Sequence, residues 1–368
     1  MGYLKMAKKI LLIANEYSTI VNFRMELITA LLNEGHSVAV ALPEHERNAE
    51  IKALGCDLFI IQMSRKGMNP IKEIKVIQGI KKILDSFNPD IVFTFTIKPN
   101  IYGGIACSGR NVPYIANITG LGVAVENKGI KQIVTSNLYK IGLKHAKIVF
   151  FQNSDNLHFM ISRGIYKGRY DLIPGSGVNL KRFKLLEYPA DDVIRFAFVA
   201  RVMREKGIDQ YLDVAERIRN KNPKTEFHIC GACEGEYEER IDSLSSKGIV
   251  IYHGIVKDMT TIYRMINCTV LPTYYPEGMS NVLLESAASG IPIITTNRAG
   301  CKEIVDNGIN GFIVRQQDSE DLYKKIELFL SLSFDERRKM GLAGRKKVER
   351  EFDRQIVVAK YIEQVKGI

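Results

Sequence analysis

The chain of 368 residues has no long apolar segment. No hydrophobic run approaches the roughly 18 residues that a membrane-spanning helix needs. The first nine residues are basic, but they lead directly into a short strand-like run, 10–13 (ILLI), without the cleavage pattern of a signal peptide. These absences predict a cytoplasmic protein. The length and the ordinary composition, with 46% hydrophobic and 25% charged residues, indicate two globular domains.

Cysteine is sparse and is not arranged for disulfides or metal binding. The six cysteines are scattered through predicted strands and helix starts, which is typical of reduced thiols. Cys230 and Cys233 have CxxC spacing, but no second pair and no nearby histidine completes a metal site. The chain also has no Asp-x-Asp metal motif. We therefore expect no bound metal and no cofactor.

Acidic residues are relatively few in the first half of the chain. Residues 1–180 carry 22 Lys and Arg against 13 Asp and Glu, a balance of +9, whereas residues 181–368 carry 30 against 28, a balance of +2. This asymmetry predicts an anionic partner for the first half, either a phospholipid surface or an anionic substrate, and general solubility is the alternative. Nucleic acid is not expected, because no basic run is interleaved with exposed aromatic residues.

Apolar runs alternate with helical patterns along the whole chain. Strands are predicted at 8–14, 37–42, 58–63, 90–96, 114–118 and 148–151, with helices at 20–32, 99–109, 129–146 and 154–163. The pattern restarts with strands at 195–200, 226–230, 249–252, 268–271, 292–295 and 311–314. Such alternation predicts an α/β protein with two Rossmann-like parallel-sheet domains facing each other across a cleft. Ligands of such sheets bind beyond the carboxyl ends of the strands.

The boundary between the domains is expected between residues 177 and 195, where the sequence is polar and lacks strong periodicity. We therefore predict an N-terminal domain over 1–180 and a C-terminal domain over 181–353. The amphipathic segment 354–368 is expected to pack back on the first domain.

Residues 70–87 (PIKEIKVIQGIKKILDSF) form a predicted amphipathic helix. Its apolar face contains Ile71, Ile74, Ile77 and Leu84, and its basic residues are Lys72, Lys75, Lys81 and Lys82. Such a helix could lie on an anionic membrane. A surface helix that packs its isoleucines on the sheet is the favoured alternative, and its lysines could still touch lipid headgroups.

Two carboxylates, Glu277 and Glu285, lie eight positions apart in 276–285 (PEGMSNVLLE). Glu277 is predicted in a loop after a strand, and Glu285 about one turn inside the following helix. The start of that helix attracts anions, because its backbone N–H groups are unpaired. At a rise of about 1.5 Å per residue the carboxylates should be roughly 10 Å apart. That distance favours gripping two ends of one ligand over two-carboxylate hydrolysis, which needs about 5 to 9.5 Å.

Two cations, Arg201 and Lys206, follow the first strand of the second half, in 200–207 (ARVMREKG). Both are expected to point from a strand end toward the ligand. Two cations beside a helix start are what a diphosphate needs, since arginine can bind it with two hydrogen bonds.

These motifs together resemble the retaining family 4 glycosyltransferases of GT-B fold. The resemblance rests on Glu277-x7-Glu285, on the Arg201-x4-Lys206 segment, and on 300–312 (GCKEIVDNGINGF). It extends over essentially the whole chain and is most specific in 195–315. Residues 64–70 (SRKGMNP) and 117–122 (NITGLG) point to the bacterial members that extend lipid-linked sugars for capsule, O-antigen or glycoprotein glycans.

The resemblance implies a role for each matching residue. Glu277 would bind the donor-sugar hydroxyls, Glu285 the ribose, and Arg201 with Lys206 the diphosphate leaving group. The remaining donor-side candidates are Gly278, Met279, Ser280 and Asn281, whose backbone amides would hold sugar and phosphate, and Gly231, His253 and Gly254, which would flank the base. The donor is expected to be a UDP-linked hexose or N-acetylhexosamine, and the acceptor a polyprenyl-diphosphate-linked saccharide. The enzyme would then work without metal, peripherally on the inner face of the cell membrane.

The first loop departs from the family pattern, because 15–22 (NEYSTIVN) replaces the Gly-Gly turn that many members have. This loop is therefore assigned to the acceptor side, where Asn22, Arg24 and Gly120 are the candidates. For Gly231, His253 and Gly254 a role as simple turn residues is an equal alternative.

The nearest competing function is a sugar-nucleotide epimerase of the same fold. An epimerase would need a side-chain acid or base at the anomeric centre, and no paired carboxylates or suitable histidine in the first half suggest one. A dinucleotide oxidoreductase is disfavoured by the lack of GxGxxG in the strand-to-helix turns. A non-catalytic sugar-nucleotide sensor would not need the complete set of site residues.

Overall fold

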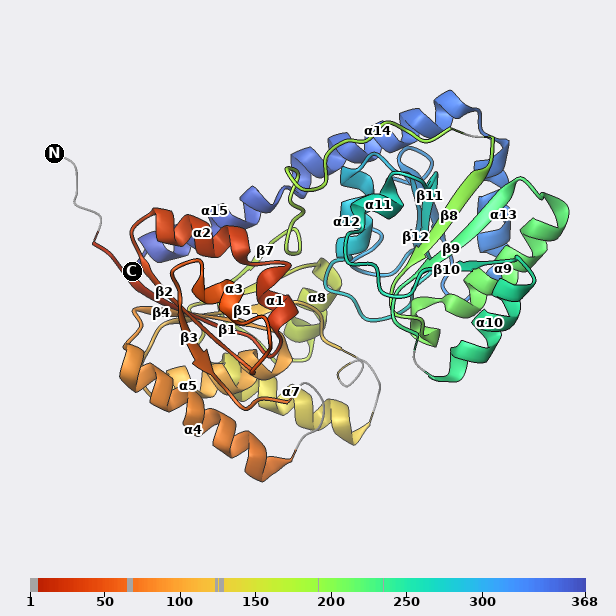
Figure 1. The fold of residues 1–368 in the computed structure, drawn as a ribbon. Helices are drawn as coiled ribbons and strands as arrows, with labels where there is room; N and C mark the ends of the chain where they lie inside the picture. Colours follow the sequence, from red (N-terminus) through yellow and green to blue (C-terminus); the bar gives the residue numbers. More distant parts are fainter. Residues whose placement is uncertain (1–5, 65–68, 123–124, 126–128, 191, 234) are drawn as a thin grey trace. The chain divides into compact units, whose positions relative to one another are not determined.

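The computed structural model describes residues 6–64, 69–122, 125, 129–190, 192–233 and 235–368. It divides into two compact units, which we call the N-domain (residues 1–176 and 354–368) and the C-domain (residues 177–353). Figure 1 labels their helices and strands. The division falls at Ser176/Gly177, four residues before the boundary expected at 180/181.

The N-domain is built on a seven-stranded parallel sheet in the order β3-β2-β1-β4-β5-β6-β7. Its strands are β1 (Lys9–Ile13), β2 (Ser37–Leu42), β3 (Asp57–Ile60), β4 (Ile91–Phe95), β5 (Tyr114–Ile118), β6 (Ile148–Phe151) and β7 (Tyr170–Leu172). Its helices are α1 (Tyr17–Val21), α2 (Met25–Asn33), α3 (Ala49–Lys52), α4 (Pro70–Phe87), the π-helix η1 (Pro99–Gly103), α5 (Gly104–Ser108), α7 (Ile130–Leu143), α8 (Ser154–Ser162) and α15 (Arg354–Lys366).

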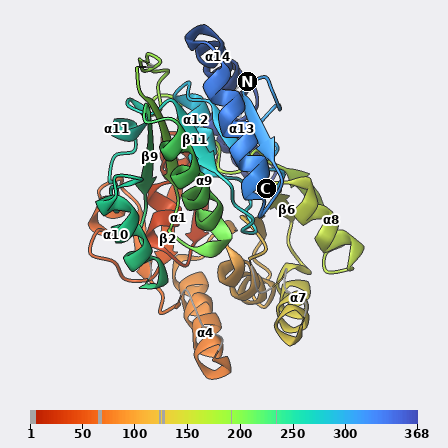
Figure 2. The ribbon, with the colours of Figure 1, turned by 90° about the vertical axis from the view of Figure 1, so that its right-hand side faces the viewer.

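Strand residues alternate between two apolar layers in this domain. Leu11 and Ile13 of β1 face the layer that holds α4, α5, α7 and α8, whereas Ile10 and Leu12 face the layer of α1, α2, α3 and α15. Because successive side chains of a strand point to opposite faces, one apolar run supplies both layers. Figures 1 and 2 show α4 and α7 together on one side of the sheet.

The C-domain repeats this plan with a six-stranded parallel sheet in the order β10-β9-β8-β11-β12-β13. Its strands are β8 (Ile194–Val199), β9 (Thr225–Cys230), β10 (Ile251–Tyr252), β11 (Cys268–Leu271), β12 (Ile293–Thr296) and β13 (Gly311–Val314). Its helices are the 3-10 turns η2 (Arg204–Lys206) and η3 (Gly235–Tyr237), α9 (Ile208–Lys221), α10 (Glu238–Ser246), α11 (Thr260–Tyr263), α12 (Asn281–Ala288), α13 (Ser319–Ser331) and α14 (Phe334–Glu351).

The predicted fold class, two parallel α/β domains, is confirmed. Several strands have the predicted bounds, among them β2, β5 and β11, because a short apolar run between polar turns marks a buried strand well. Two local predictions are wrong. The expected helix 20–32 is divided into α1 and α2 at Asn22, and the expected strand 58–63 is β3 at Asp57–Ile60. The short edge strand β7 was not predicted, because only three residues pair there.

Helix α15 is part of the N-domain although it follows the C-domain in sequence. Its Tyr361 is fully buried among Phe93, Phe95 and Phe150, with ring centroids 4.9, 6.0 and 5.0 Å away. The Tyr361 hydroxyl accepts a hydrogen bond of 2.7 Å from Nδ2 of Asn117 on β5. At the start of α15, Arg354 makes an ion pair of 2.8 Å with Glu26 of α2.

We expect Tyr361→Phe to lower the free energy of unfolding by about 1–3 kcal/mol, because it leaves the buried Asn117 amide without its acceptor. Urea unfolding followed by circular dichroism would measure the change. The matched control is Tyr170→Phe at an exposed position. Equal stability of the two variants would contradict the proposed weight of the Asn117–Tyr361 bond.

Candidate functional site

The C-domain sheet reverses its strand order between β8 and β11, which are neighbours. The chain leaves these two strands in opposite directions, and at such a reversal open α/β sheets bind ligands beyond the carboxyl ends of the strands. Arg201 and Lys206 follow β8, and Glu277 follows β11. The topology therefore places three candidate residues in the two loops that border the reversal.

Lys206 and Glu277 form an ion pair across this point. The Nζ atom of Lys206 donates a hydrogen bond to Oε1 of Glu277, and both side chains are largely buried. The same Nζ atom lies 4.7 Å from the centroid of the Tyr275 ring, within range of a cation–π attraction. The ammonium group is therefore fixed by two partners from the loop after β11.

Glycine at 207 allows the two loops to approach so closely. Gly207 has φ +82°, and a Cβ atom there would lie 2.2 Å from the carbonyl oxygen of Pro272. The neighbouring carbonyl of Glu205 accepts hydrogen bonds from the amide of Tyr274 at 2.9 Å and from the Thr273 hydroxyl at 3.2 Å. The loops after β8 and β11 are thus one hydrogen-bonded unit, and any larger residue at 207 would separate them.

A second close approach shapes the turn that leads into α12. Gly300 has φ +84°, and a Cβ atom there would lie 2.6 Å from the carbonyl oxygen of Gly278. The amide of Ser280 donates a hydrogen bond of 2.8 Å to the carbonyl of Gly300. The amides after Gly278 were expected to hold the donor. Because the Ser280 amide is already engaged, the candidates are now the amides of Asn281 and of Met279, which is buried.

Helix α12 begins at Asn281 and carries Glu285 in its second turn, as predicted. The Glu285 carboxylate accepts a hydrogen bond of 3.3 Å from the Tyr263 hydroxyl, and burial holds the pKa of Tyr263 well above its usual value, so this hydroxyl keeps its proton. The Oδ1 atom of Asn281 is buried and accepts no hydrogen bond from the residues that the structure describes.

The glycines at the ends of β9 and β10 are engaged with each other. The amide of Gly231 donates a hydrogen bond of 2.7 Å to the carbonyl of Gly254, and the Gly231 carbonyl accepts one of 3.0 Å from the Tyr252 hydroxyl. A Cβ atom on Gly231 would lie 1.9 Å from the carbonyl oxygen of Ala200. These contacts favour a packing role for Gly231 over direct ligand binding.

His253 is paired with His228, a buried histidine that no sequence motif marks. Nδ1 of His228 and Nε2 of His253 are 2.9 Å apart, and the two rings are stacked. Burial and the neighbouring His253 lower the pKa of His228 to about 4, although Glu226 lies 3.3 Å from its Nε2 atom. Burial also lowers the pKa of His253. Both rings are therefore neutral at pH 7, and the pair fixes the orientation of the His253 ring.

The N-domain has its own reversal of strand order, between β1 and β4. Thr96 directly follows β4 with φ +74°, a left-handed conformation that is costly for a β-branched residue. Its hydroxyl donates a hydrogen bond of 2.8 Å to Oδ1 of Asn15, which follows β1. Backbone strain maintained at a switch point is typical of a binding site, but a sequence gives no sign of it.

The three acceptor-side candidates lie in different environments. Asn22 is exposed between α1 and α2, and Gly120 follows β5 with φ +132°. Arg24 is buried, and its guanidinium carbon lies 4.4 Å from the centroid of the Phe95 ring. Burial lowers the pKa of Arg24 to about 10. This environment favours a structural role for Arg24 over contact with an acceptor. Of the motif at 64–70, residues 65–68 lie outside the described part of the chain.

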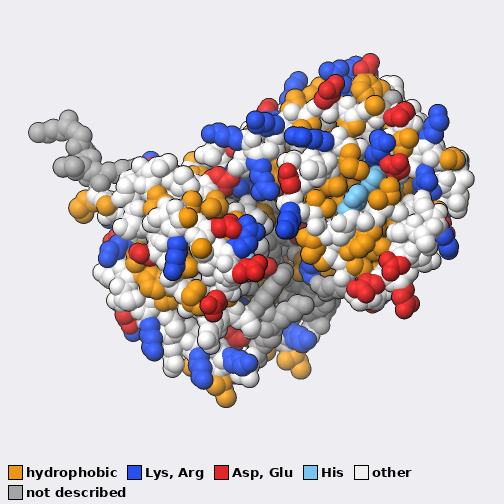
Figure 3. Space-filling view, in the orientation of Figure 1, with side chains coloured by type: hydrophobic (Ala, Val, Ile, Leu, Met, Phe, Trp, Pro, Cys, Tyr) orange, Lys and Arg blue, Asp and Glu red, His pale blue; other side chains and the backbone are white. Residues whose placement is uncertain are grey.

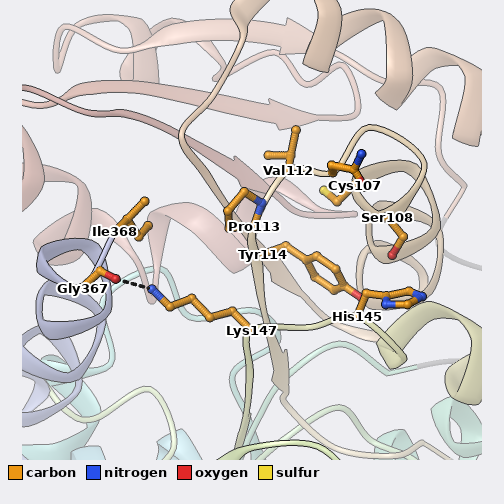
Figure 4. A pocket seen from close by; sticks show the side chains of 10 residues that line it. Cys107, Ser108, Val112, Pro113, Tyr114, His145, Lys147, Gly367 and Ile368 are labelled. Carbon is orange, nitrogen blue, oxygen red and sulfur yellow. Dashed lines mark hydrogen bonds between the residues drawn. The ribbon is translucent and has the colours of Figure 1, made fainter.

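A cavity of about 590 Å³ lies at the amino ends of the N-domain strands, opposite the carboxyl ends where ligands of such sheets bind (Figure 4). Pro113 and Tyr114 line it where β5 begins, and Lys147 lines it just before β6. The Lys147 ammonium donates a hydrogen bond of 3.0 Å to the carbonyl of Gly367. Since ligands of parallel sheets bind at the carboxyl edge, this amino-terminal cavity is separate from the candidate site.

Two family models match the chain. The model described as glycosyl transferases group 1 matches residues 181–347, and the model described as glycosyl transferase 4-like matches residues 9–153. The chain belongs to the GT-B-fold glycosyltransferases. The resemblance inferred from the motifs is thereby confirmed, and so is the assignment as an enzyme.

Relatives and solved structures agree with this assignment. The glycosyltransferase is 26% identical to N,N'-diacetylbacillosaminyl-diphospho-undecaprenol alpha-1,3-N-acetylgalactosaminyltransferase of Campylobacter jejuni, over 94% of this chain and 95% of that one. It is 25% identical to UDP-Gal:alpha-D-GlcNAc-diphosphoundecaprenol alpha-1,3-galactosyltransferase of Escherichia coli, over 71% of each chain. A glycosyltransferase from Rickettsia africae has the same fold, with a TM-score of 0.79, 20% identity and 98% coverage of both chains. So does HepE of Anabaena in complex with UDP and glucose, with a TM-score of 0.80, 14% identity and coverage of 98% of this chain and 100% of that one.

The buried histidine pair predicts a loss of stability in mild acid. Because the unfolded chain takes up a proton on His228 near pH 6.5 and the folded chain only near pH 4, the free energy of unfolding should fall as the pH drops through this interval. Urea unfolding at several pH values would measure the slope. We expect His228→Gln to flatten it and the exposed control His158→Gln to leave it unchanged. Parallel profiles for wild type and His228→Gln would disprove this assignment.

Proposed function

We propose that this glycosyltransferase moves a hexose or N-acetylhexosamine, with retention of anomeric configuration, from a UDP-linked donor to a polyprenyl-diphosphate-linked saccharide. The proposed setting is the synthesis of a surface polysaccharide or a related glycan. The observation that carries the proposal is the Lys206–Glu277 pair at the switch point of the C-domain. The names of the Campylobacter and Escherichia relatives support a lipid-diphosphate acceptor and an N-acetylgalactosaminyl or galactosyl donor.

In the proposed complex the C-domain holds the donor. Glu277 accepts hydrogen bonds from the sugar hydroxyls, and Glu285, already held by Tyr263, accepts those of the ribose. Arg201 and Lys206 contact the diphosphate, and the start of α12 adds the dipole of the helix and the amide of Asn281. His253 lies beside the base. Asn22 and Gly120 of the N-domain remain candidates for the acceptor.

The proposed reaction breaks the bond between the anomeric carbon and the diphosphate oxygen and forms a bond from that carbon to an acceptor hydroxyl on the same face. The electron pair of the broken bond stays on UDP, and the departing phosphate oxygen takes the hydroxyl proton. Negative charge grows on the diphosphate as the bond breaks, so two fixed cations stabilise the transition state more than the ground state. In this scheme the cations do the electrostatic work of a metal, and no side-chain base is required.

An epimerase gains no support from the relatives described above.

Within the described residues, no group of three or more His, Cys, Asp or Glu side chains is placed to hold a metal ion. No helix among them is long and apolar enough to cross a membrane. We propose that the enzyme works at the cytoplasmic face of the cell membrane and approaches its lipid-linked acceptor from an anionic bilayer surface.

We expect Lys206→Ala and Glu277→Ala each to lower the turnover number by a factor of about 10² to 10³, because each removes a charge or hydrogen bond needed in the transition state. Release of UDP and formation of the glycolipid product would be measured together. The matched control is Lys221→Ala, which breaks an exposed Lys–Glu ion pair of the same domain, with Glu327. Near-wild-type turnover in both site variants would refute the assigned roles.

A donor panel tests the substrate class. The enzyme would be offered UDP- and GDP-linked hexoses and N-acetylhexosamines, with and without a polyprenyl-diphosphate N-acetylhexosamine acceptor. We expect transfer from UDP-linked sugars only. An α-linked donor should give an α-linked product, and the proton coupling at the anomeric centre of the product would identify its configuration. A C2 or C4 epimer formed without acceptor would identify an epimerase instead.

A further inference from the structure

Helix α7 of the N-domain presents its aliphatic side chains to solvent. Ile130, Ile133, Val134 and Ile141 are 81, 61, 41 and 57% exposed. Their spacing of three, four and eleven positions puts them on one stripe of the helix. The buried side of the helix combines the polar Gln132 and Thr135 with the apolar Tyr139 and Leu143. The helix therefore leaves an aliphatic stripe exposed, whereas a surface helix usually buries such a stripe.

The first turns of α4 have the same character. Ile71 and Ile74 are 69 and 56% exposed, whereas Val76, Ile80 and Leu84 are buried against the sheet. The prediction that Ile71 and Ile74 pack with Leu84 on the apolar face is therefore wrong. These two isoleucines belong to the outer surface of the domain, beside exposed Lys72 and Lys75.

Helices α4 and α7 are held firmly on the same layer of the domain, on either side of the η1–α5 segment. Gly104 of α5 and Gly142 of α7 meet so closely that a Cβ atom on Gly104 would lie 1.8 Å from the Gly142 carbonyl oxygen. On the other side, Lys98 before η1 makes a buried ion pair of 2.6 Å with Glu73 of α4. The exposed isoleucines of both helices therefore project from one rigid layer, whose helices Figures 1 and 2 show together.

The charge around these isoleucines is positive. No Asp or Glu occurs between residues 129 and 154, whereas Lys131 and Lys140 of α7 and Lys144 at its C-cap are exposed. On α4, Glu73 is neutralised by Lys98, and Asp85 by an ion pair of 2.6 Å with Arg110. In Figure 3, Lys and Arg side chains and hydrophobic side chains are interspersed along the lower edge of this domain, where Figure 1 draws α4 and α7.

We propose that this surface, the α4–α7 face, docks on an anionic lipid bilayer. Ile71 and Ile74 of α4 and Ile130, Ile133, Val134 and Ile141 of α7 would enter the boundary between headgroups and acyl chains, and the lysines would contact lipid phosphates. An amphipathic surface with aliphatic residues inside a basic border is the chemistry that such a membrane binds. The proposal deepens the proposed function and rests on it in one respect, because a polyprenyl-diphosphate acceptor is confined to the bilayer.

Sedimentation of the full chain with vesicles tests the docking without donor or acceptor. Wild type should bind vesicles of phosphatidylcholine with phosphatidylglycerol, bind phosphatidylcholine alone more weakly, and lose affinity as salt is raised. Ile133→Gln with Ile141→Gln should weaken binding about tenfold or more, because the insertion of two side chains is lost. Lys140→Gln with Lys144→Gln should weaken it by about tenfold in low salt only.

Matched controls lie in the C-domain. Ile255→Gln with Ile309→Gln removes two comparably exposed isoleucines, and Lys339→Gln with Lys346→Gln removes two exposed lysines of α14. Both controls should bind as wild type does. Equal losses in the α7 and control pairs, or no binding by wild type, would overturn the proposal. A wild-type dimer that becomes a monomer in Ile133→Gln with Ile141→Gln would also overturn it, because a second copy would then cover the face.

A transfer assay separates this proposal from the proposed function. With a water-soluble, short-chain acceptor, the α7 variants should keep wild-type turnover, and with acceptor in vesicles they should lose about tenfold. If wild type transfers sugar to the soluble acceptor but does not bind vesicles, the docking proposal is refuted and the proposed transferase function stands. If wild type binds vesicles but transfers sugar to neither acceptor, the proposed substrate is refuted and the docking proposal stands.

Discussion

A parallel sheet brings the carboxyl ends of all its strands to one edge, and this constraint positions the residues discussed above. In the C-domain the reversal between β8 and β11 sets the Lys206 loop beside the Glu277 loop, although 71 positions separate the two residues in the chain. In the N-domain the reversal between β1 and β4 sets Asn15 beside Thr96. Loops that carry chemistry can vary in sequence as long as the strands beneath them keep their order.

The Lys206–Glu277 pair gives the proposed donor site a fixed geometry before any ligand arrives. A lone lysine in a largely buried position would be costly, and a lone carboxylate equally so, but each compensates the other. In the proposed complex the diphosphate would replace the Glu277 carboxylate as the anion beside Lys206. The sugar hydroxyls would replace the Lys206 ammonium as hydrogen-bond donors to Glu277. Little rearrangement of the protein is then needed at the moment of reaction, which is the condition for efficient electrostatic stabilisation.

The sequence was sufficient for most of the strands, although it misplaced β3 and missed β7, and insufficient wherever a residue's partner was decisive. Apolar runs bounded by turns located β2, β5 and β11, and the predicted loop-to-helix junction placed Glu285 about one turn inside α12. The hydrogen bond from the Ser280 amide to Gly300 and the His228–His253 pair depend on segments that the sheet brings together. No local sequence pattern therefore predicts them.

Periodicity gave a wrong apolar face for α4 for a related reason. A helical stripe of isoleucines states that an apolar face exists, but not which way it faces. In α4 the inner face is the one with Val76 and Ile80, and in α7 the inner face is partly polar. The orientation of each helix is set by its crossing with η1 and α5, where Gly104 and Gly142 permit close contact. Likewise, the buried Arg24 could be recognised only once Phe95 was seen against it.

The return of α15 to the N-domain has a consequence for how the chain folds as it is synthesised. Because Tyr361 completes the apolar layer behind β4 and β6, residues before 177 cannot reach their final packing until the ribosome has added α15. The continuous C-domain has no such dependence and can finish first, which inverts the usual amino-terminal-first order of domain folding. During that interval the open layer beneath Phe93 and Phe150 exposes apolar surface, so the growing chain is most open to chaperone binding and aggregation just before α15 emerges.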